Sequence, residues 1–242
     1  MKLSVIIPLY NEKNTVRELL ERVAAVPLSK QIIIIDDCST DGTTEVLKSL
    51  EREEGYENGF LFLYHGRNRG KGAAIRTAQS HVEGDIVIIQ DGDLEYDPAE
   101  YPGLVAPIVR GDADVVYGSR FSDPAHCPLT SVHTMANRFL TFLSNRFNGL
   151  ALTDMETCYK AFRSDVFGRI PIESDRFGFE PEVTARIARM KCRVREVRIS
   201  YRGRTRREGK KISWWDGMST VWTIIRYGVI DKIWPGRTTK LH

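Results

Sequence analysis

The chain reads Asp85-Ile86-Val87-Ile88-Ile89-Gln90 and then Asp91-Gly92-Asp93, so that an unbroken apolar run ends in two carboxylates. The run is short and rich in β-branched residues, which predicts a strand buried on both faces. In an extended chain the side chains at i and i+2 point to the same side. Asp91 and Asp93 are therefore expected to leave a strand's carboxyl end together, where ligands of open α/β sheets bind. A turn with two solvated aspartates is the alternative interpretation.

Outward from this stretch, apolar runs alternate with segments of helical periodicity. Continuous Ile and Val runs separated by amphipathic helices indicate a mostly parallel sheet covered on both faces, which is an α/β fold. After about residue 120 the alternation stops. Strands are predicted at 3–9, 31–36, 60–65, 85–90 and 114–118, and helices at 12–25, 39–53, 72–81 and 98–110.

Composition limits the class of protein. The 242 residues are 42% hydrophobic and 28% charged, which is typical of a globular chain with a sizeable core. We expect neither a signal peptide nor a transmembrane helix, because no apolar segment has the required length and position. The four cysteines are far apart and match neither a zinc site nor a disulfide framework. Reduced thiols in a cytoplasmic protein are the expectation.

The net charge of +3 hides a basic segment. Residues 186–211 contain 12 Lys and Arg against only two acids, Glu196 and Glu208. Such a segment could meet nucleic acid, anionic lipid or a phosphorylated substrate, or it could be a solvated face. Tyr201 is its only aromatic residue, whereas a single-strand binder interleaves aromatic and basic side chains. We therefore do not expect nucleic acid as a partner.

Polar motifs follow each of the first four predicted strands. The third motif has glycines, a lysine and a helix start, which is the chemistry of a phosphate-binding loop without the Walker A spacing. The last pairs two carboxylates, the ligands that Mg²⁺ and Mn²⁺ prefer together with substrate phosphates. Turn and capping chemistry explains one such segment more easily than four in series. The motifs are Pro8-Leu9-Tyr10-Asn11-Glu12, Asp36-Asp37-Cys38-Ser39-Thr40-Asp41-Gly42-Thr43, Asn68-Arg69-Gly70-Lys71-Gly72-Ala73-Ala74 and Asp91-Gly92-Asp93.

Taken in order, these motifs resemble those of family-2 glycosyltransferases, over about residues 3–215. The resemblance implies a GT-A, Rossmann-like domain at 1–211, with a nucleotide-sugar half at 1–118 and an acceptor half at 119–211. An amphipathic segment at 212–242 follows. The second half is similar to the dolichol-phosphate mannose synthase branch, through Val116-Tyr117-Gly118-Ser119-Arg120, Asn137-Arg138, Asp154-x-x-Thr157-x-Tyr159-Lys160, Gly178-Phe179-Glu180 and Glu208-Gly209-Lys210-Lys211. Cys158 departs from the glycine that is usual in this branch.

The resemblance also implies a role for each candidate residue. Asp154 could either act near the reacting carbon or only orient the segment 157–160. Catalysis is assigned to Asp93, Asp154 and Glu180. Nucleotide-sugar binding is assigned to Pro8, Tyr10, Glu12, Asp37, Lys71 and Asp91. The metal, Mg²⁺ or Mn²⁺, is assigned to Asp91, Asp93 and Glu95, and the acceptor phosphate to Arg120, Asn137, Thr141 and Arg204.

The implied activity is inverting, metal-dependent transfer of a sugar from a GDP-mannose or UDP-glucose type donor to a dolichyl or undecaprenyl phosphate. A phosphate monoester has a second pKa near ~6, so this acceptor needs arginine more than a general base. Transfer to a glycan or other hydroxyl is an alternative, with Asp154 or Glu180 as base. A non-catalytic sugar-nucleotide binding module is the third hypothesis, although the intact Asp91 and Asp93 argue against it. The absence of Gln-x-x-Arg-Trp argues against a processive polysaccharide synthase.

The last predicted helix is amphipathic and rich in tryptophan. Charged residues interrupt it, which predicts a helix lying in a membrane interface, with packing onto the core or a second subunit as the alternative. The helix 137–147 is a second candidate for membrane contact. Many relatives carry C-terminal transmembrane helices, which are not expected here. We expect a peripheral protein on the cytoplasmic face of a membrane, or one held by a membrane-anchored partner. The apolar residues of the last helix are Trp214, Trp215, Met218, Val221, Trp222, Ile225, Val229 and Ile233.

Overall fold

The computed structural model describes residues 1–56, 58–121, 131–176, 178–203 and 214–231. These residues form a seven-stranded sheet in the order β3-β2-β1-β4-β6-β5-β7. Neighbouring strands pair in parallel, except that β6 is antiparallel to both β4 and β5. The predicted α/β fold with a mostly parallel sheet is therefore confirmed. The strands are β1 (Leu3–Leu9), β2 (Lys30–Asp36), β3 (Phe60–Tyr64), β4 (Ile86–Ile89), β5 (Val115–Ser119), β6 (Lys160–Arg163) and β7 (Val194–Arg198).

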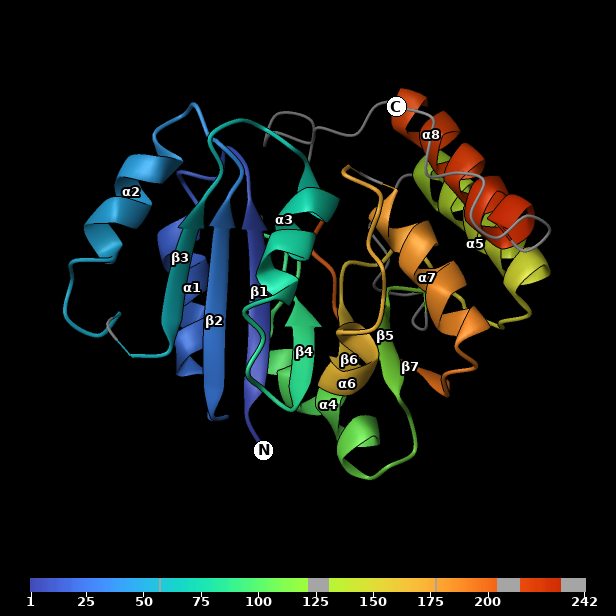
Figure 1. Ribbon diagram of the computed structural model, residues 1–242, viewed down its shortest axis with the longest axis horizontal. Coiled ribbons are helices and arrows are strands. Elements are labelled where there is room, and N and C mark those ends of the chain that lie inside the picture. The colour runs from blue at the N-terminus through green and yellow to red at the C-terminus, as the bar shows by residue number, and fades with distance from the viewer. Residues whose placement is uncertain (57, 122–130, 177, 204–213, 232–242) are drawn as a thin grey trace.

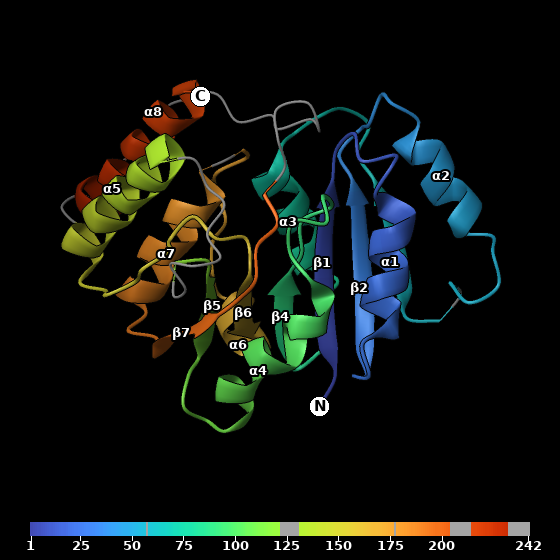
Figure 2. The same cartoon turned by 180° about the vertical axis from the view of Figure 1, so that it is seen from behind.

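Helices cover both faces of the sheet (Figure 1). On one face lie α3 (Lys71–Gln79), α6 (Ser164–Phe167) and α7 (Phe179–Arg189). Figure 2 shows α1 (Val16–Ala25) and α4 (Tyr101–Val109) on the other face, where the 3₁₀ turn η1 (Pro98–Glu100) precedes α4. The helix α2 (Thr43–Leu50) packs against α1. Two further helices, α5 (Ser131–Asn148) and α8 (Trp214–Ile225), pack on α7 beyond the β5 side of the sheet, and α8 continues as the π-helical turn η4 (Arg226–Ile230).

The central strands are continuous apolar runs because both of their faces are covered. Along β1 and β2 the register runs from Leu3 opposite Lys30 to Leu9 opposite Asp36. Nearly every apolar side chain of β1, β2 and β4 is buried. This double burial fixes the carboxyl ends of the strands, which carry the polar motifs, at one edge of the sheet.

Two strands were not predicted, and both are short and charged. β6 has four residues with a lysine and an arginine at its ends, so it contains no apolar run from which a strand could be predicted. β7 has three charged residues and only two apolar ones, Val194 and Val197, and it forms one edge of the sheet. Charged side chains on an edge strand discourage pairing with another chain. The predicted end of strand alternation near residue 120 was therefore wrong.

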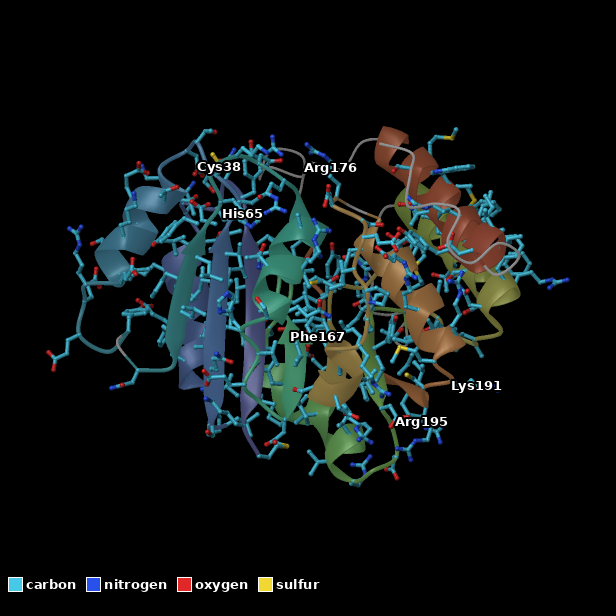
Figure 3. The ribbon with its side chains drawn as sticks, viewed as in Figure 1. Cys38, His65, Phe167, Arg176, Lys191 and Arg195 are labelled. Atoms are coloured by element: carbon cyan, nitrogen blue, oxygen red, sulfur yellow. The ribbon has the colours of Figure 1, made fainter. Side chains whose placement is uncertain are left out.

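Part of the basic segment is paired with carboxylates where the structure describes it. Arg186 contacts Glu173 at 2.8 Å and Glu182 at 3.3 Å, and Arg193 contacts Asp114 at 2.9 Å. Figure 3 shows Lys191 and Arg195 far from the carboxyl ends of β1 to β3, where Cys38, His65 and Arg176 lie. These residues do not form a single basic surface at that edge.

Crossing a bilayer requires a long, apolar helix, and the described part of the chain contains no helix that meets both conditions.

Candidate active site

A pocket of about 620 Å³ opens at the carboxyl ends of β1, β2 and β4. It brings together most of the predicted site residues from both halves of the chain. Three others, Asn137, Thr141 and Asp154, are buried and do not line it, and Arg204 lies outside the described residues. The predicted residues that line the pocket are Pro8, Tyr10, Glu12, Asp37, Lys71, Asp91, Asp93, Glu95, Arg120 and Glu180.

The backbone at this edge takes up unusual conformations. Asn11, Cys38 and Leu94 have φ angles of 56°, 60° and 59°, in the loops that follow β1, β2 and β4. Asparagine adopts this left-handed region readily, but leucine and cysteine seldom do. Such residues persist where the surrounding structure holds them, and they concentrate at functional sites. The strained positions therefore mark the same edge as the pocket.

Gly92 separates the two aspartates because no side chain would fit there. A Cβ atom at this position would overlap Cδ2 of Leu9 and approach Cγ of Glu12 to 3.2 Å. Thr15 donates a hydrogen bond of 2.8 Å from Oγ1 to the Gly92 carbonyl. The chain's own β1 end, rather than a ligand, thus makes the close approach at this glycine. The contact fixes the loop that carries both aspartates.

The loop 68–74 differs from the predicted phosphate cradle. The amides of Arg69 and Gly70 donate to the Asp37 carboxylate at 2.9 and 2.6 Å, and the Ala73 amide donates to the Asp175 carbonyl at 3.1 Å. A Cβ atom on Gly72 would overlap the Ser174 carbonyl, so glycine allows the segment 174–175 to cross this helix start. The phosphate-cradle interpretation is wrong for these three amides, because the chain itself occupies them.

Asp37 instead anchors the loop that presents Lys71. Its Oδ1 also lies 2.6 Å from Nδ1 of His65, whose side chain is buried with it. Lys71 is the first residue of α3, and its Nζ lies 2.8 Å from Asp91 Oδ1 and 2.8 Å from Glu180 Oε1. Burial opposes the charged form of Lys71, yet attraction to Asp91 and Glu180 holds its pKa well above the ordinary value. One buried cation thus ties the end of β4 to the start of α7.

Asp154 lies behind the pocket wall in a bidentate ion pair with Arg120. Nε and Nη2 of Arg120 each donate to the Asp154 carboxylate at 2.7 Å, and the Arg120 amide donates at 3.1 Å. Asn137 adds a bond of 3.3 Å and receives one from Thr141 at 3.2 Å. Asp154 is fully buried, and the Arg120 guanidinium lies 5.1 Å from the ring centre of Tyr201. Asp154 therefore positions Arg120, and its direct catalytic role stays a prediction.

The predicted metal ligands are not gathered into a ready-made cluster. Among the described residues, no three His, Cys, Asp or Glu side chains are close enough to hold a metal ion by themselves. Asp93 Oδ1 accepts the Glu95 amide at 3.2 Å, while Glu95 Oε2 accepts the Tyr201 hydroxyl at 2.6 Å. Mg²⁺ is usually held by one or two carboxylates plus substrate phosphates. Asp91 and Asp93 supply such a pair, so the donors present fit a divalent cation that binds together with a diphosphate.

Nine pocket residues had no predicted role in the site. Four of these nine were also not named in any sequence motif, namely Tyr96, Glu156, Arg176 and Tyr201. Arg176 and Tyr201 belong to no motif, and only the fold brings them to the pocket. Glu156 stands inside the 154–160 motif and could have been found there. Burial, followed by the charge of Glu180, raises its pKa to about 8. A carboxyl group with a displaced pKa in a pocket is a candidate functional residue.

Comparison with known sequences finds relatives of this chain. A profile of the family described as Glycosyl transferase family 2 matches residues 4–170. The chain is 32% identical over 211 residues to undecaprenyl-phosphate 4-deoxy-4-formamido-L-arabinose transferase of Edwardsiella ictaluri, covering 86% of this chain and 62% of that protein. It is 26% identical over 208 residues to dodecaprenyl-phosphate galacturonate synthase of Rhizobium johnstonii, covering 84% and 60%. The chain thus spans about three fifths of the length of these curated relatives.

Comparison with solved structures agrees with the fold. Glucosyl-3-phosphoglycerate synthase from Mycobacterium tuberculosis, in complex with Mn²⁺, UDP and glucosyl-3-phosphoglycerate, superposes with a TM-score of 0.71. The match covers 93% of this chain and 79% of that chain at 18% identity. At this identity the likeness shows the shared fold alone.

Proposed function

Because this chain belongs to glycosyl transferase family 2 and has the GT-A fold, we propose that it is an inverting, metal-dependent glycosyltransferase. Its donor is a nucleotide-sugar of the GDP-mannose or UDP-glucose type, and its acceptor is a dolichyl or undecaprenyl phosphate. One observation carries the proposal. A single pocket at the carboxyl edge joins Pro8, Tyr10 and Asp37 of the nucleotide-sugar half to Arg120 of the acceptor half, with two aspartates between them.

The donor diphosphate is assigned to the middle of the pocket. Asp91 and Asp93 would hold Mg²⁺ or Mn²⁺, which would neutralise the charge that develops on the leaving diphosphate. Lys71 adds a permanent positive charge beside Asp91. Pro8, Tyr10 and Glu12 line the end of the pocket formed by β1, where the nucleoside is expected.

The acceptor is assigned to the arginine side of the pocket. Both curated relatives are named for a polyprenyl phosphate. A phosphate monoester is largely dianionic at neutral pH, because its second pKa is near ~6. It attacks the anomeric carbon through one oxygen while the bond from that carbon to the diphosphate breaks, with inversion. Arg120, which Asp154 orients, and Arg204, which lies outside the described residues, are the proposed grips on this phosphate.

Transfer to a hydroxyl acceptor is the weaker alternative. It would need a general base, and Asp154 and Glu180 were the candidates. The structure places Asp154 in its pair with Arg120, and Glu180 in its pair with Lys71. Both proposed bases are therefore engaged with cations, whereas a phosphate acceptor needs no strong base.

The first test identifies donor and acceptor together. The protein is incubated with Mn²⁺ or Mg²⁺, an undecaprenyl or dolichyl phosphate, and radiolabelled GDP-mannose, UDP-glucose and UDP-glucuronate in turn. We expect label to become butanol-extractable with one of these donors and only when both metal and lipid phosphate are present. Labelling of a glycan or peptide without labelling of lipid would contradict the proposed acceptor.

Two neighbouring helices each expose apolar side chains, which suit the lipid tail of this acceptor. Met135, Phe139 and Phe142 of α5 and Met218 and Trp222 of α8 are 56–68% exposed, at helical spacing. The two helices pack side by side at the end of the molecule (Figure 1). We propose that this α5/α8 face rests on the membrane surface, as amphipathic interfacial helices do. This proposal adds a reason for the membrane contact that the sequence predicts for both helices, namely access to the lipid acceptor.

Phe142→Asp is expected to weaken binding to vesicles by at least about 10-fold. Burying a phenylalanine side chain in an apolar phase is worth about 1.5–3 kcal/mol, and an aspartate there carries a further penalty. The measurement is sedimentation with vesicles of phosphatidylcholine and phosphatidylglycerol. Val109→Asp is a matched control, because Val109 is 58% exposed at the end of α4, outside this face. Equal loss in both variants, or no loss with Phe142→Asp, would contradict the proposal.

A further inference from the structure

Glu156 has a carboxylate oxygen for which the described part of the chain supplies no hydrogen-bond partner. Its Oε1 is buried and makes no hydrogen bond to any described residue. A buried oxygen left unpaired costs free energy, so each case in a native protein requires a reason. The other described side chains with such an atom do not line the pocket, and they are Glu100, Asn148, Thr157, Arg186, Arg189 and Arg226. Among these groups, only Glu156 is also a lining residue of the pocket.

The cations around Glu156 are already engaged. Lys71 contacts Asp91 and Glu180, and Arg120 contacts Asp154. Lys160 is fully buried, donates from Nζ to the Thr157 carbonyl, and lies 4.8 Å from the ring centre of Tyr117. Among the described residues, no Lys or Arg forms an ion pair with Glu156, and Lys160 and Arg120 act on its charge without one.

The protonation state of Glu156 follows from this environment. Burial, and then the charge of Glu180, raises its pKa to about 8, while Lys160 and Arg120 oppose the shift and Asp154 adds to it. The raised pKa favours the neutral, protonated form of this carboxyl group. A neutral carboxyl offers one hydrogen-bond donor and one acceptor, which complements a hydroxyl group.

The backbone around Glu156 is fixed on both sides. Thr141 Oγ1 accepts the Met155 amide at 3.1 Å, and the Tyr96 hydroxyl accepts the Cys158 amide at 3.2 Å. Asp154 is locked to Arg120. The side chain is thus presented by a rigid segment, as a residue that selects a substrate must be.

We propose that Glu156 is a specificity-determining residue whose carboxyl group binds a hydroxyl group of the transferred sugar. Lys71 links Glu180, whose charge acts on Glu156, to Asp91, where the donor diphosphate is assigned. The sugar attached to that diphosphate is the donor group that can reach the acceptor side of the pocket. This inference rests on the proposed function, because it assumes a nucleotide-sugar donor.

The test compares two variants by calorimetry in the presence of Mn²⁺. Dissociation constants are measured for UDP-glucose against UDP, and for GDP-mannose against GDP, and the nucleotide that the wild type binds is used. Glu156→Leu removes the hydrogen-bonding group at similar size. It is expected to worsen the ratio of nucleotide-sugar affinity to nucleoside-diphosphate affinity by about 10-fold or more, with diphosphate affinity nearly unchanged.

Glu156→Gln is the rescuing variant. Its amide keeps a donor and an acceptor at the same place, so the affinity ratio is expected to stay within a few-fold of the wild type. Thr157→Val is the matched control, because Thr157 Oγ1 is also buried without a described partner but Thr157 does not line the pocket. It should leave the ratio unchanged.

Three results would overturn the inference. If Glu156→Leu lowers both affinities equally, the residue has only a structural role. If the variant changes neither affinity, Oε1 binds water rather than sugar. If Glu156→Gln fails to restore the ratio, hydrogen bonding is not the cause. Binding is measured without acceptor, so this test can be interpreted even if the protein transfers no sugar to lipid. If the wild type binds none of these nucleotides, both proposals are overturned.

Discussion

Asp93→Ala is expected to lower sugar transfer by about 10²–10³-fold or more while the protein stays folded. Asp93 lines the pocket and is partly exposed, so its removal leaves no buried charge behind. The variant would lose one of the two carboxylates proposed to hold the divalent cation. Transfer to lipid phosphate at increasing Mn²⁺ measures the effect, and thermal unfolding checks that the fold is intact.

The chain offers a closely matched control for Asp93. Asp97 lies four residues further on and accepts the Ala99 amide at 3.0 Å, just as Asp93 accepts the Glu95 amide two residues ahead. Asp97 is exposed and does not line the pocket. Asp97→Ala is therefore expected to keep its activity. Normal turnover by Asp93→Ala, or an equal loss in both variants, would refute the metal assignment.

Arg120→Met is expected to lower the free energy of unfolding by about 3–5 kcal/mol and to abolish transfer. The substitution leaves Asp154 fully buried without the two 2.7 Å bonds that now satisfy its carboxylate. Urea unfolding measures the loss. The exposed pair of Arg110 and Asp112, at 2.8 Å, provides the control, because Arg110→Met should cost only about 0–1 kcal/mol.

A double variant separates stability from function at this pair. Arg120→Met combined with Asp154→Leu removes both charges, and replacing a buried ion pair by apolar groups is often close to neutral. We expect much of the stability to return while transfer stays abolished, because Arg120 is the proposed grip on the acceptor phosphate. Recovery of transfer would show that Arg120 acts only through the fold. A single variant as stable as the wild type would contradict the energetic argument.

Local sequence patterns predict the strands of the N-terminal half of the chain well. The strands β1, β2 and β4 are continuous apolar runs, and the glycine and aspartates of 91–93 stand directly after one of them. Each of these signals spans fewer than ten residues. The apolar run and the turn that follows it are therefore visible in the sequence without knowledge of the fold.

Sequence analysis missed contacts between residues that are distant along the chain. The amides of Arg69 and Gly70 fit a phosphate cradle by local pattern, but Asp37, from the end of β2, fills it. The contact of Lys71 with Glu180 was not predicted, because it joins residues more than one hundred positions apart. Glu156 was not predicted, because its distinguishing feature is an oxygen without a described hydrogen-bond partner. That feature is visible only in the folded chain.

The crossing of the 174–175 segment over α3 has a consequence for protein engineering. The segment 174–175 reaches back to the N-terminal half of the chain at Gly72, and β6 is inserted between β4 and β5. In a chimera, a relative's sequence would replace the chain after residue 118. The grafted part must reproduce both contacts in order to pack on residues 1–118. New acceptor specificity is better sought by exchanging single pocket side chains than by exchanging halves.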